Sequence, residues 1–150
     1  MITIRGHHLF DMLGALATGE STHKTLGPVA RQVRAAPRTP IRLVIGVDDI
    51  CAPCEWWDHA AGHCRRSLKE HPEDNRNSLT SDANAIAALG LEPGATLPAN
   101  ELYQRIQARV DETVFAERVC LACRLVASCR KTYTQRIVDT VKALSGAAAS

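Results

Sequence analysis

The sequence predicts a mainly α fold with a small β-sheet (α+β), built as a single compact domain over residues 1–150. Apolar residues recur at helical spacing in several segments, and one short run is rich in β-branched residues. A chain of this length can be stabilised by its own hydrophobic core and does not need a bound metal to fold. No domain boundary or long repeat is visible, so we expect one domain.

The first third of the chain is expected to hold one strand and two helices. Residues 1–4 alternate apolar and polar side chains, which is typical of a short strand. Residues 9–16 carry an apolar stripe at helical spacing, and Gly19 is placed to end that helix. Residues 21–36 predict a second, amphipathic helix.

The strongest strand candidate is the β-branched run Ile41–Val47. It follows the chain break at Pro40 and leads through Asp48 and Asp49 to Cys51. We therefore expect the first cysteine group to begin at a strand end.

Helices are expected to predominate in the second half of the chain. A short helix over residues 82–89 is predicted to end at Gly90. One face of a buried helix is indicated from residue 100 onward by apolar residues at every fourth position: Leu102, Ile106, Val110 and Val114. A last helix is expected over residues 129–144, followed by a frayed tail at 146–150.

All the cysteines fall into two groups, each a Cys-x-x-Cys turn followed by one more cysteine. The groups are Cys51, Cys54 and Cys64, and Cys120, Cys123 and Cys129. Three thiolates make three of the four ligands that a tetrahedral zinc or a cubane iron–sulfur cluster needs. Gly62 can supply the bend that returns Cys64, whereas one unbroken helix would turn Cys129 away from its partners. Each triad therefore predicts an incomplete metal site.

Charge and hydropathy limit the classes of partner and the cellular compartment that we expect for this protein. The net charge is +2 and there is no dense basic run, so we expect neither nucleic acid nor an anionic membrane as partner. No stretch is apolar enough to span a bilayer and no secretory signal is visible, so we expect a cytoplasmic protein. In a reducing compartment, Cys-x-x-Cys pairs are more often metal ligands or redox groups than disulfides.

Two histidines and two aspartates are the candidates for chemistry beside the thiolates. His7 and His8 open the first predicted helix, and His8 is the candidate additional metal ligand. Asp48 and Asp49 can orient an imidazole or simply cap the following turn. A purely structural role is at least as common for each histidine. We expect any reaction to lie between the first helix and residues 46–64, with these four side chains as catalytic candidates.

Three stretches carry a family resemblance: HHLF, GVDDICAPC followed by GHC, and a terminal CLAC followed by SC. They resemble the cysteine-rich family known as domain of unknown function twelve-eighty-four, whose members are described as candidate iron–sulfur-binding proteins. The resemblance runs from Arg5 to about Lys131 and implies roles for His7, His8, Asp48, Asp49 and all the cysteines. Members often have a cysteine where this chain has Asp11, so a thiolate ligand is replaced by a carboxylate or removed.

The favoured interpretation is an iron–sulfur protein, with a 4Fe-4S cluster across both triads or one cluster in each. It would act in electron transfer with a redox partner protein, or as a cluster-dependent enzyme on a small molecule. The alternative is a zinc module that uses three cysteines and a histidine at each site for structure or partner binding. Spacing does not separate the two, and the resemblance favours iron and sulfur. A thiol–disulfide redox protein ranks last, because four cysteines would be unexplained.

Overall fold

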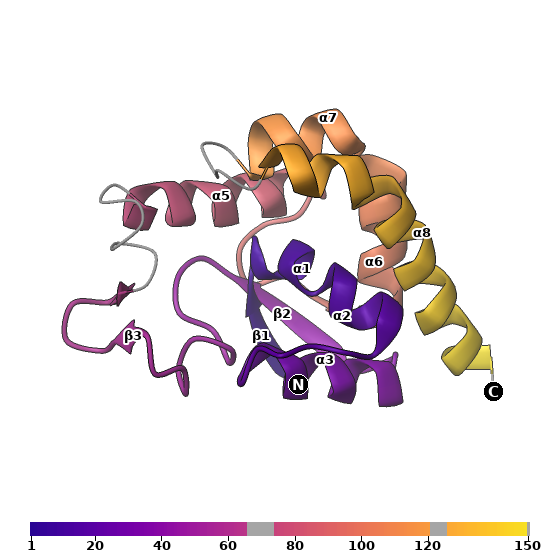
Figure 1. Cartoon of the computed structure of the whole chain (residues 1–150), viewed down its shortest axis with the longest axis horizontal. Coiled ribbons are helices and arrows are strands. Elements are labelled where there is room, and N and C mark those ends of the chain that lie inside the picture. Colours follow the sequence, from indigo (N-terminus) through magenta and orange to yellow (C-terminus); the bar gives the residue numbers. More distant parts are fainter. Residues whose placement is uncertain (66–73, 121–125, 150) are drawn as a thin grey trace.

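The structure is a computed structural model that describes residues 1–65, 74–120 and 126–149 (Figure 1). It confirms the α+β class, with helices packed around a small mixed sheet. The helices are α1 (His8–Asp11), α2 (Leu13–Thr18), α3 (Leu26–Ala35), α5 (Asp74–Ala88), α6 (Ala99–Arg109), α7 (Glu112–Val114), the π-helix η1 (Phe115–Val119) and α8 (Val126–Ala149). The strands are β1 (Ile2–Arg5), β2 (Pro40–Val44), β3 (Trp57–Asp58), β4 (His63–Cys64) and β5 (Thr96–Pro98).

The main sheet has the order β1-β2-β5, with β1 parallel and β5 antiparallel to β2. Strand β2 ends at Val44, three residues earlier than the sequence predicts. The chain then bends through Gly46, whose φ of 96° is readily available only to glycine. Asp48 therefore lies in a loop beyond the strand. Strand β5 was not predicted, since proline and glycine around it are typical of a connection.

The predicted N-terminal helix is two short helices, α1 and α2, which meet at Met12. Gly19 ends α2 with a φ of 80°, as predicted. Helix α3 begins at Leu26 rather than at residue 21. The ring nitrogen Nδ1 of His23 accepts hydrogen bonds from the backbone N–H groups of Thr25 and Leu26, at 3.2 and 3.0 Å, and so takes the place of a cap.

The C-terminal half contains longer helices than the sequence predicts. Helix α5 begins at Asp74 instead of residue 82. The stripe from Leu102 to Val114 is divided, because α6 ends at Arg109 and α7 and η1 follow. Helix α8 includes residues 146–149, where the sequence predicts a frayed tail. The alanine run there has high helix propensity, and that preference extends the helix.

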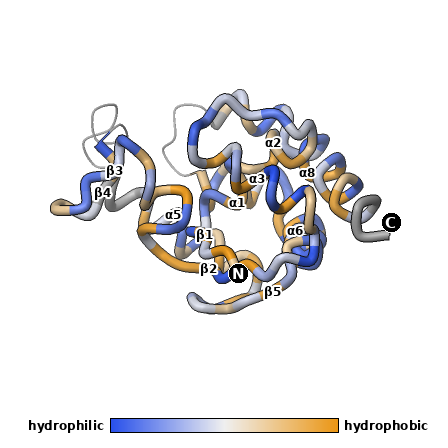
Figure 2. The backbone as a smooth tube through the Cα atoms, turned by 90° about the horizontal axis from the view of Figure 1, so that it is seen from below, coloured by the Kyte–Doolittle hydropathy of each residue, from blue (hydrophilic) through white to orange (hydrophobic). Residues whose placement is uncertain are grey.

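The hydrophobic core lies between the sheet and the helices α2, α6 and α8. Phe115 and Tyr133 stack with their ring centroids 4.4 Å apart, and the Tyr133 hydroxyl donates a hydrogen bond to the carbonyl of Val110 at 2.5 Å. The β3–β4 hairpin projects on the opposite side of the molecule from α6 and α8 in both views (Figures 1 and 2). None of the helices in the described part of the chain has the length and hydropathy to cross a membrane.

Candidate metal centre

The first cysteine triad lines a pocket of about 90 Å³. Cys51, Cys54 and Cys64 share its wall with His7 and His8, as well as with Arg5. The loop after β2, the β3–β4 hairpin and the chain between β1 and α1 thus meet at one cavity. The structure therefore brings together two histidines and three cysteines that the sequence singled out from separate segments.

The loop that carries Cys51 is shaped by the carboxylate of Asp48. Its Oδ1 accepts hydrogen bonds from the backbone N–H groups of Ile50 at 3.0 Å and Cys51 at 2.8 Å. This is the turn-capping role open to an aspartate in this position. A further turn follows, in which the Cys54 N–H donates to the carbonyl of Cys51 at 2.9 Å. Cys51 and Cys54 consequently lie on consecutive turns facing one pocket.

The third thiol returns on the β3–β4 hairpin. Trp57 pairs with Cys64 across this antiparallel pair of strands. The connecting loop is closed by Asp58, whose Oδ1 accepts from the N–H groups of Ala60 and Ala61 at 3.0 Å each. Gly62 has a φ of 72°, which confirms the predicted bend before Cys64.

Asp48 also holds the ring of His8. Its Oδ2 lies 2.7 Å from Nδ1 of His8 and accepts from the backbone N–H of Arg5 at 2.8 Å. The Asp48 side chain is fully buried, and burial alone would raise its pKa. The hydrogen bond and charge of His8, together with the backbone N–H groups of Arg5 and Cys51, outweigh burial and lower the pKa of Asp48 to about 2. A carboxylate is therefore fixed behind this imidazole.

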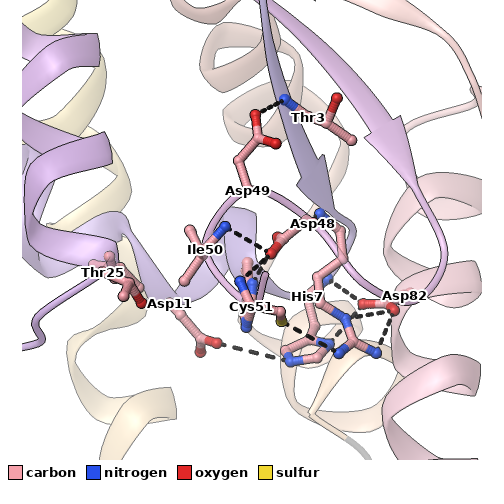
Figure 3. A network of polar contacts seen from close by, with 12 residues as sticks. Thr3, His7, Asp11, Thr25, Asp48, Asp49, Ile50, Cys51 and Asp82 are labelled. Atoms are coloured by element: carbon pink, nitrogen blue, oxygen red, sulfur yellow. Dashed lines mark hydrogen bonds and ion pairs between the residues drawn. The ribbon is translucent and has the colours of Figure 1, made fainter. Parts of the chain in front are cut away.

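The ring of His7 has its own buried carboxylate, Asp82 of α5 (Figure 3). Nδ1 of His7 lies 2.6 Å from Oδ1 of Asp82, and the His7 backbone N–H donates to the same oxygen at 3.1 Å. Burial lowers the pKa of His7, but the hydrogen bond and charge of Asp82 and the charge of Asp11 leave it raised. His7 therefore holds its proton more tightly than an exposed imidazole does.

Arg5 links this carboxylate to the first cysteine. Its Nε and Nη2 each lie 2.8 Å from Oδ2 of Asp82, and its Nη1 lies 3.8 Å from Sγ of Cys51. Burial and the charge of Asp48 raise the pKa of Cys51 to about 12, and Arg5 offsets only part of that effect. The Arg5 side chain is 5% exposed, so its charge acts in a medium of low dielectric.

The sequence missed Arg5 and Asp82 as site residues. Asp82 was expected only at the start of a helix, although it lies three, four and seven positions before the apolar residues Ala85, Ile86 and Leu89. Asp82 therefore lies on the same helix face as these apolar residues. An acidic residue on an apolar helix face is the signal that could have identified a buried carboxylate. Its pKa is lowered, because the contacts with His7 and Arg5 outweigh burial.

Asp49 is directed away from the pocket wall. Its Oδ2 accepts from the backbone N–H of Thr3 at 2.8 Å, and its own N–H donates to the carbonyl of Thr3 at 3.0 Å. These two bonds attach the loop to β1. The structure thus separates the two adjacent aspartates, with Asp48 on the imidazole and Asp49 on the strand.

The second cysteine group is placed in part. Cys120 follows η1 and Cys129 lies in α8, and both pack against the hydrophobic core. Cys123 lies outside the described residues. The end of η1 is attached to α5, where the Ser81 hydroxyl donates to the carbonyl of Val119 and the Asn84 amide donates to that of Arg118 at 2.8 Å. Among the described residues, the wall of the pocket contains no cysteine of this group.

Donor atoms gather most closely around His8. Among the residues that the structure describes, two groups of three bring their donor atoms within 4.8 Å of one another: His7, His8 and Asp11, and His8, Asp48 and Cys51. The group of His8, Asp48 and Cys51 connects the cysteine pocket to the start of α1. The group of His7, His8 and Asp11 includes the exposed side chain of Asp11 instead.

Comparison with known proteins gives a family and no relative of established activity. No curated protein and no solved structure matches the chain. A family model described as "Protein of unknown function (DUF1284)" matches residues 21–129, which is well over half of the chain. The match includes all the cysteines and begins after His7 and His8. The chain therefore belongs to the DUF1284 family.

Proposed function

We propose that this chain is a cytoplasmic iron–sulfur protein whose cluster is held by Cys51, Cys54 and Cys64. The observation that carries the proposal is the convergence of these thiols on one pocket of about 90 Å³. Three thiols on one pocket wall supply three of the four ligands that a cubane cluster needs. Thiolates are also the usual ligands of iron–sulfur clusters.

The donor set fits such a group. The three sulfurs come from two consecutive turns and a hairpin, and Asp48 and Gly62 fix the backbone on either side. Bound metal favours the thiolate form, so it would reverse the raised pKa of Cys51. When bound, the cluster supplies one-electron redox chemistry or a Lewis-acidic iron. We propose electron transfer with a redox partner protein, or a reaction on a small molecule in the pocket.

The protein's own residues tune and complete the site. Arg5 lies 3.8 Å from Sγ of Cys51 and stabilises negative charge on that sulfur. His8 lines the same pocket, with its ring fixed by Asp48, and is the side chain placed to serve as a fourth ligand or to exchange a proton with a bound molecule. Arg5 cannot exchange a proton at neutral pH and remains a fixed charge.

A zinc site is the second candidate. The donor atoms of His8, Asp48 and Cys51 lie within 4.8 Å of one another, which is a compact arrangement of nitrogen, oxygen and sulfur. A single ion held there with Cys54 or Cys64 would have a structural or partner-binding role.

Metal and sulfide analysis tests the proposal. The protein is purified without oxygen, and iron, zinc and acid-labile sulfide are measured per chain beside the absorption spectrum. Iron with sulfide and a broad visible band is expected. The iron count then tells whether the second triad, Cys120, Cys123 and Cys129, carries a cluster of its own. Stoichiometric zinc in a colourless protein that takes up no iron and sulfide on reconstitution would overturn the cluster and favour the zinc site.

A further inference from the structure

A second set of ligands lies at the start of α1, on the outer side of the histidine pair. His7, His8 and Asp11 bring one donor atom each to within 4.8 Å of the others. Nε2 of His7 lies 3.9 Å from Oδ2 of Asp11 (Figure 3). The imidazole centroids of His7 and His8 are 4.7 Å apart. No thiol belongs to this group, so its donors are two nitrogens and one oxygen.

Both imidazoles are oriented from behind by buried carboxylates. Nδ1 of His7 contacts Asp82, which is fully buried, and Nδ1 of His8 contacts Asp48, which is 3% exposed. Each ring therefore keeps Nε2 as the nitrogen that remains for a ligand. Histidines that bind metal almost always donate their other ring N–H to a carboxylate, a carbonyl or water, and here both histidines of an adjacent pair do so.

A surface ion pair does not account for this arrangement. A contact of 3.9 Å between His7 and the half-exposed Asp11 contributes little to stability. It also gives no reason for the buried carboxylate that orients His8. Two fixed imidazoles beside one accessible carboxylate are, in contrast, the donor set of many mononuclear metal sites.

We propose that His7, His8 and Asp11 bind one divalent first-row transition metal ion. Two imidazoles and a carboxylate suit ions such as Fe²⁺, Co²⁺ and Zn²⁺ and disfavour Mg²⁺ and Ca²⁺, which prefer oxygen. The side chain of His7 is 22% exposed, that of His8 14% and that of Asp11 54%, so the outer face of the ion stays open to water or a small anionic ligand. The two histidines also line the thiolate pocket, whereas Asp11 is not among the residues of its wall. The proposed ion needs no thiolate ligand, so its binding can be tested apart from the cluster.

Charge on the inner side favours a cation at this position. Asp48, Asp82 and Asp11 carry negative charge around the two rings, and Arg5 offsets part of it through Asp82. Cys51 belongs to the other group of donor atoms, with His8 and Asp48, and its Sγ lies 3.8 Å from Nη1 of Arg5.

Co²⁺ titration of the full-length apoprotein at neutral pH, without oxygen, tests this site. Absorption separates the two kinds of ligand, because thiolate ligands give Co²⁺ an intense charge-transfer band in the near ultraviolet and nitrogen and oxygen ligands do not. We expect one Co²⁺ per chain that gives visible bands and does not add to the thiolate band of any Co²⁺ bound by the cysteines. We expect Asp11→Asn to weaken this binding by about 10- to 100-fold.

Two variants provide controls. Glu20→Gln removes an exposed carboxylate elsewhere and is expected to leave Co²⁺ affinity unchanged. Cys54→Ser is expected to lose thiolate-bound metal while the Asp11-dependent Co²⁺ remains, so failure of the cluster and failure of this site give different results. The proposal is overturned if Asp11→Asn binds Co²⁺ as tightly as the natural chain, or if all bound Co²⁺ shows the thiolate band.

Discussion

Nδ1 of His8 lies 2.7 Å from Oδ2 of Asp48, across forty positions of the sequence. Because the pKa of Asp48 is lowered to about 2, the carboxylate accepts this bond and Nδ1 of the ring carries the proton. The same carboxylate caps the turn at Cys51 through its other oxygen. A single side chain thus fixes both the ring and the first thiol of the proposed metal centre.

Acid is expected to weaken the fold through Asp48. Its pKa falls from 3.8 to about 2 on folding, so the folded state favours the ionised form. The stabilisation is complete above the higher value and is lost as the pH falls toward the lower one, a loss of about 2 kcal/mol. Urea unfolding between these pH values measures it. In Asp48→Asn this part of the pH dependence should disappear. If the free energy of unfolding of Asp48→Asn fell between these pH values as much as that of the natural chain, Asp48 would not be the cause of the loss.

Asp82 is expected to be essential to stability. Asp82→Asn removes the charge that faces Arg5 at 2.8 Å and leaves a buried guanidinium without its carboxylate. Breaking a buried pair from one side costs about 3–5 kcal/mol. Unfolding by urea, followed by circular dichroism, measures the change. Asp139→Asn on α8 serves as the matched control, with an expected change within about 0.5 kcal/mol, and a similarly small effect at Asp82 would refute this role.

Close backbone packing at Gly6 supports the same network. A Cβ at Gly6 would lie 2.3 Å from the backbone carbonyl oxygen of Asp82, so one of the two segments would have to shift. We expect Gly6→Ala to destabilise the fold by about 1–3 kcal/mol and to displace His7 from its carboxylate. Gly14→Ala is the control, because a Cβ at Gly14 in α2 meets nothing within 4 Å. It should be neutral or stabilise by up to about 1 kcal/mol, and equal losses at both glycines would contradict this account.

Cys51 in the apoprotein is expected to react slowly with alkylating agents. Its pKa is raised to about 12 and the residue is 6% exposed, so at pH 8 it is a protonated, buried thiol. Iodoacetamide labelling followed by peptide mass spectrometry gives the rate at each cysteine. Cys54, which is partly exposed, provides the internal comparison. Labelling of Cys51 as fast as that of an unhindered thiol would show that the loop does not hold it as described.

The local parts of the site were predictable from the sequence, and the long-range parts were not. Cys51, Cys54, Cys64, His7 and His8 stand in short motifs whose residue types indicate ligands, and the structure places all of them on one pocket. Gly62 could be predicted as the bend because only a tight return brings Cys64 back.

The contacts that orient these residues depend on tertiary packing. Arg5 and Asp82 are 77 positions apart, and no local pattern pairs a strand residue with a helix residue at that separation. Asp48 and Asp49 are adjacent and chemically alike, so the sequence could not tell which one faces the imidazole. The bend at Gly46 determines which aspartate faces the imidazole. It also ends β2 earlier than the β-branched residues after Val44 would predict.

The most direct test of the central claim is iron and acid-labile sulfide per chain in Cys64→Ser and Cys129→Ser, each purified without oxygen beside the natural chain. Cys64 lies on the pocket wall and Cys129 lies in α8 against the core. We expect Cys64→Ser to lose the cluster of the first triad with its visible absorption, while Cys129→Ser keeps it. Full iron and sulfide in Cys64→Ser, or none in the natural chain, would contradict a cluster in this pocket.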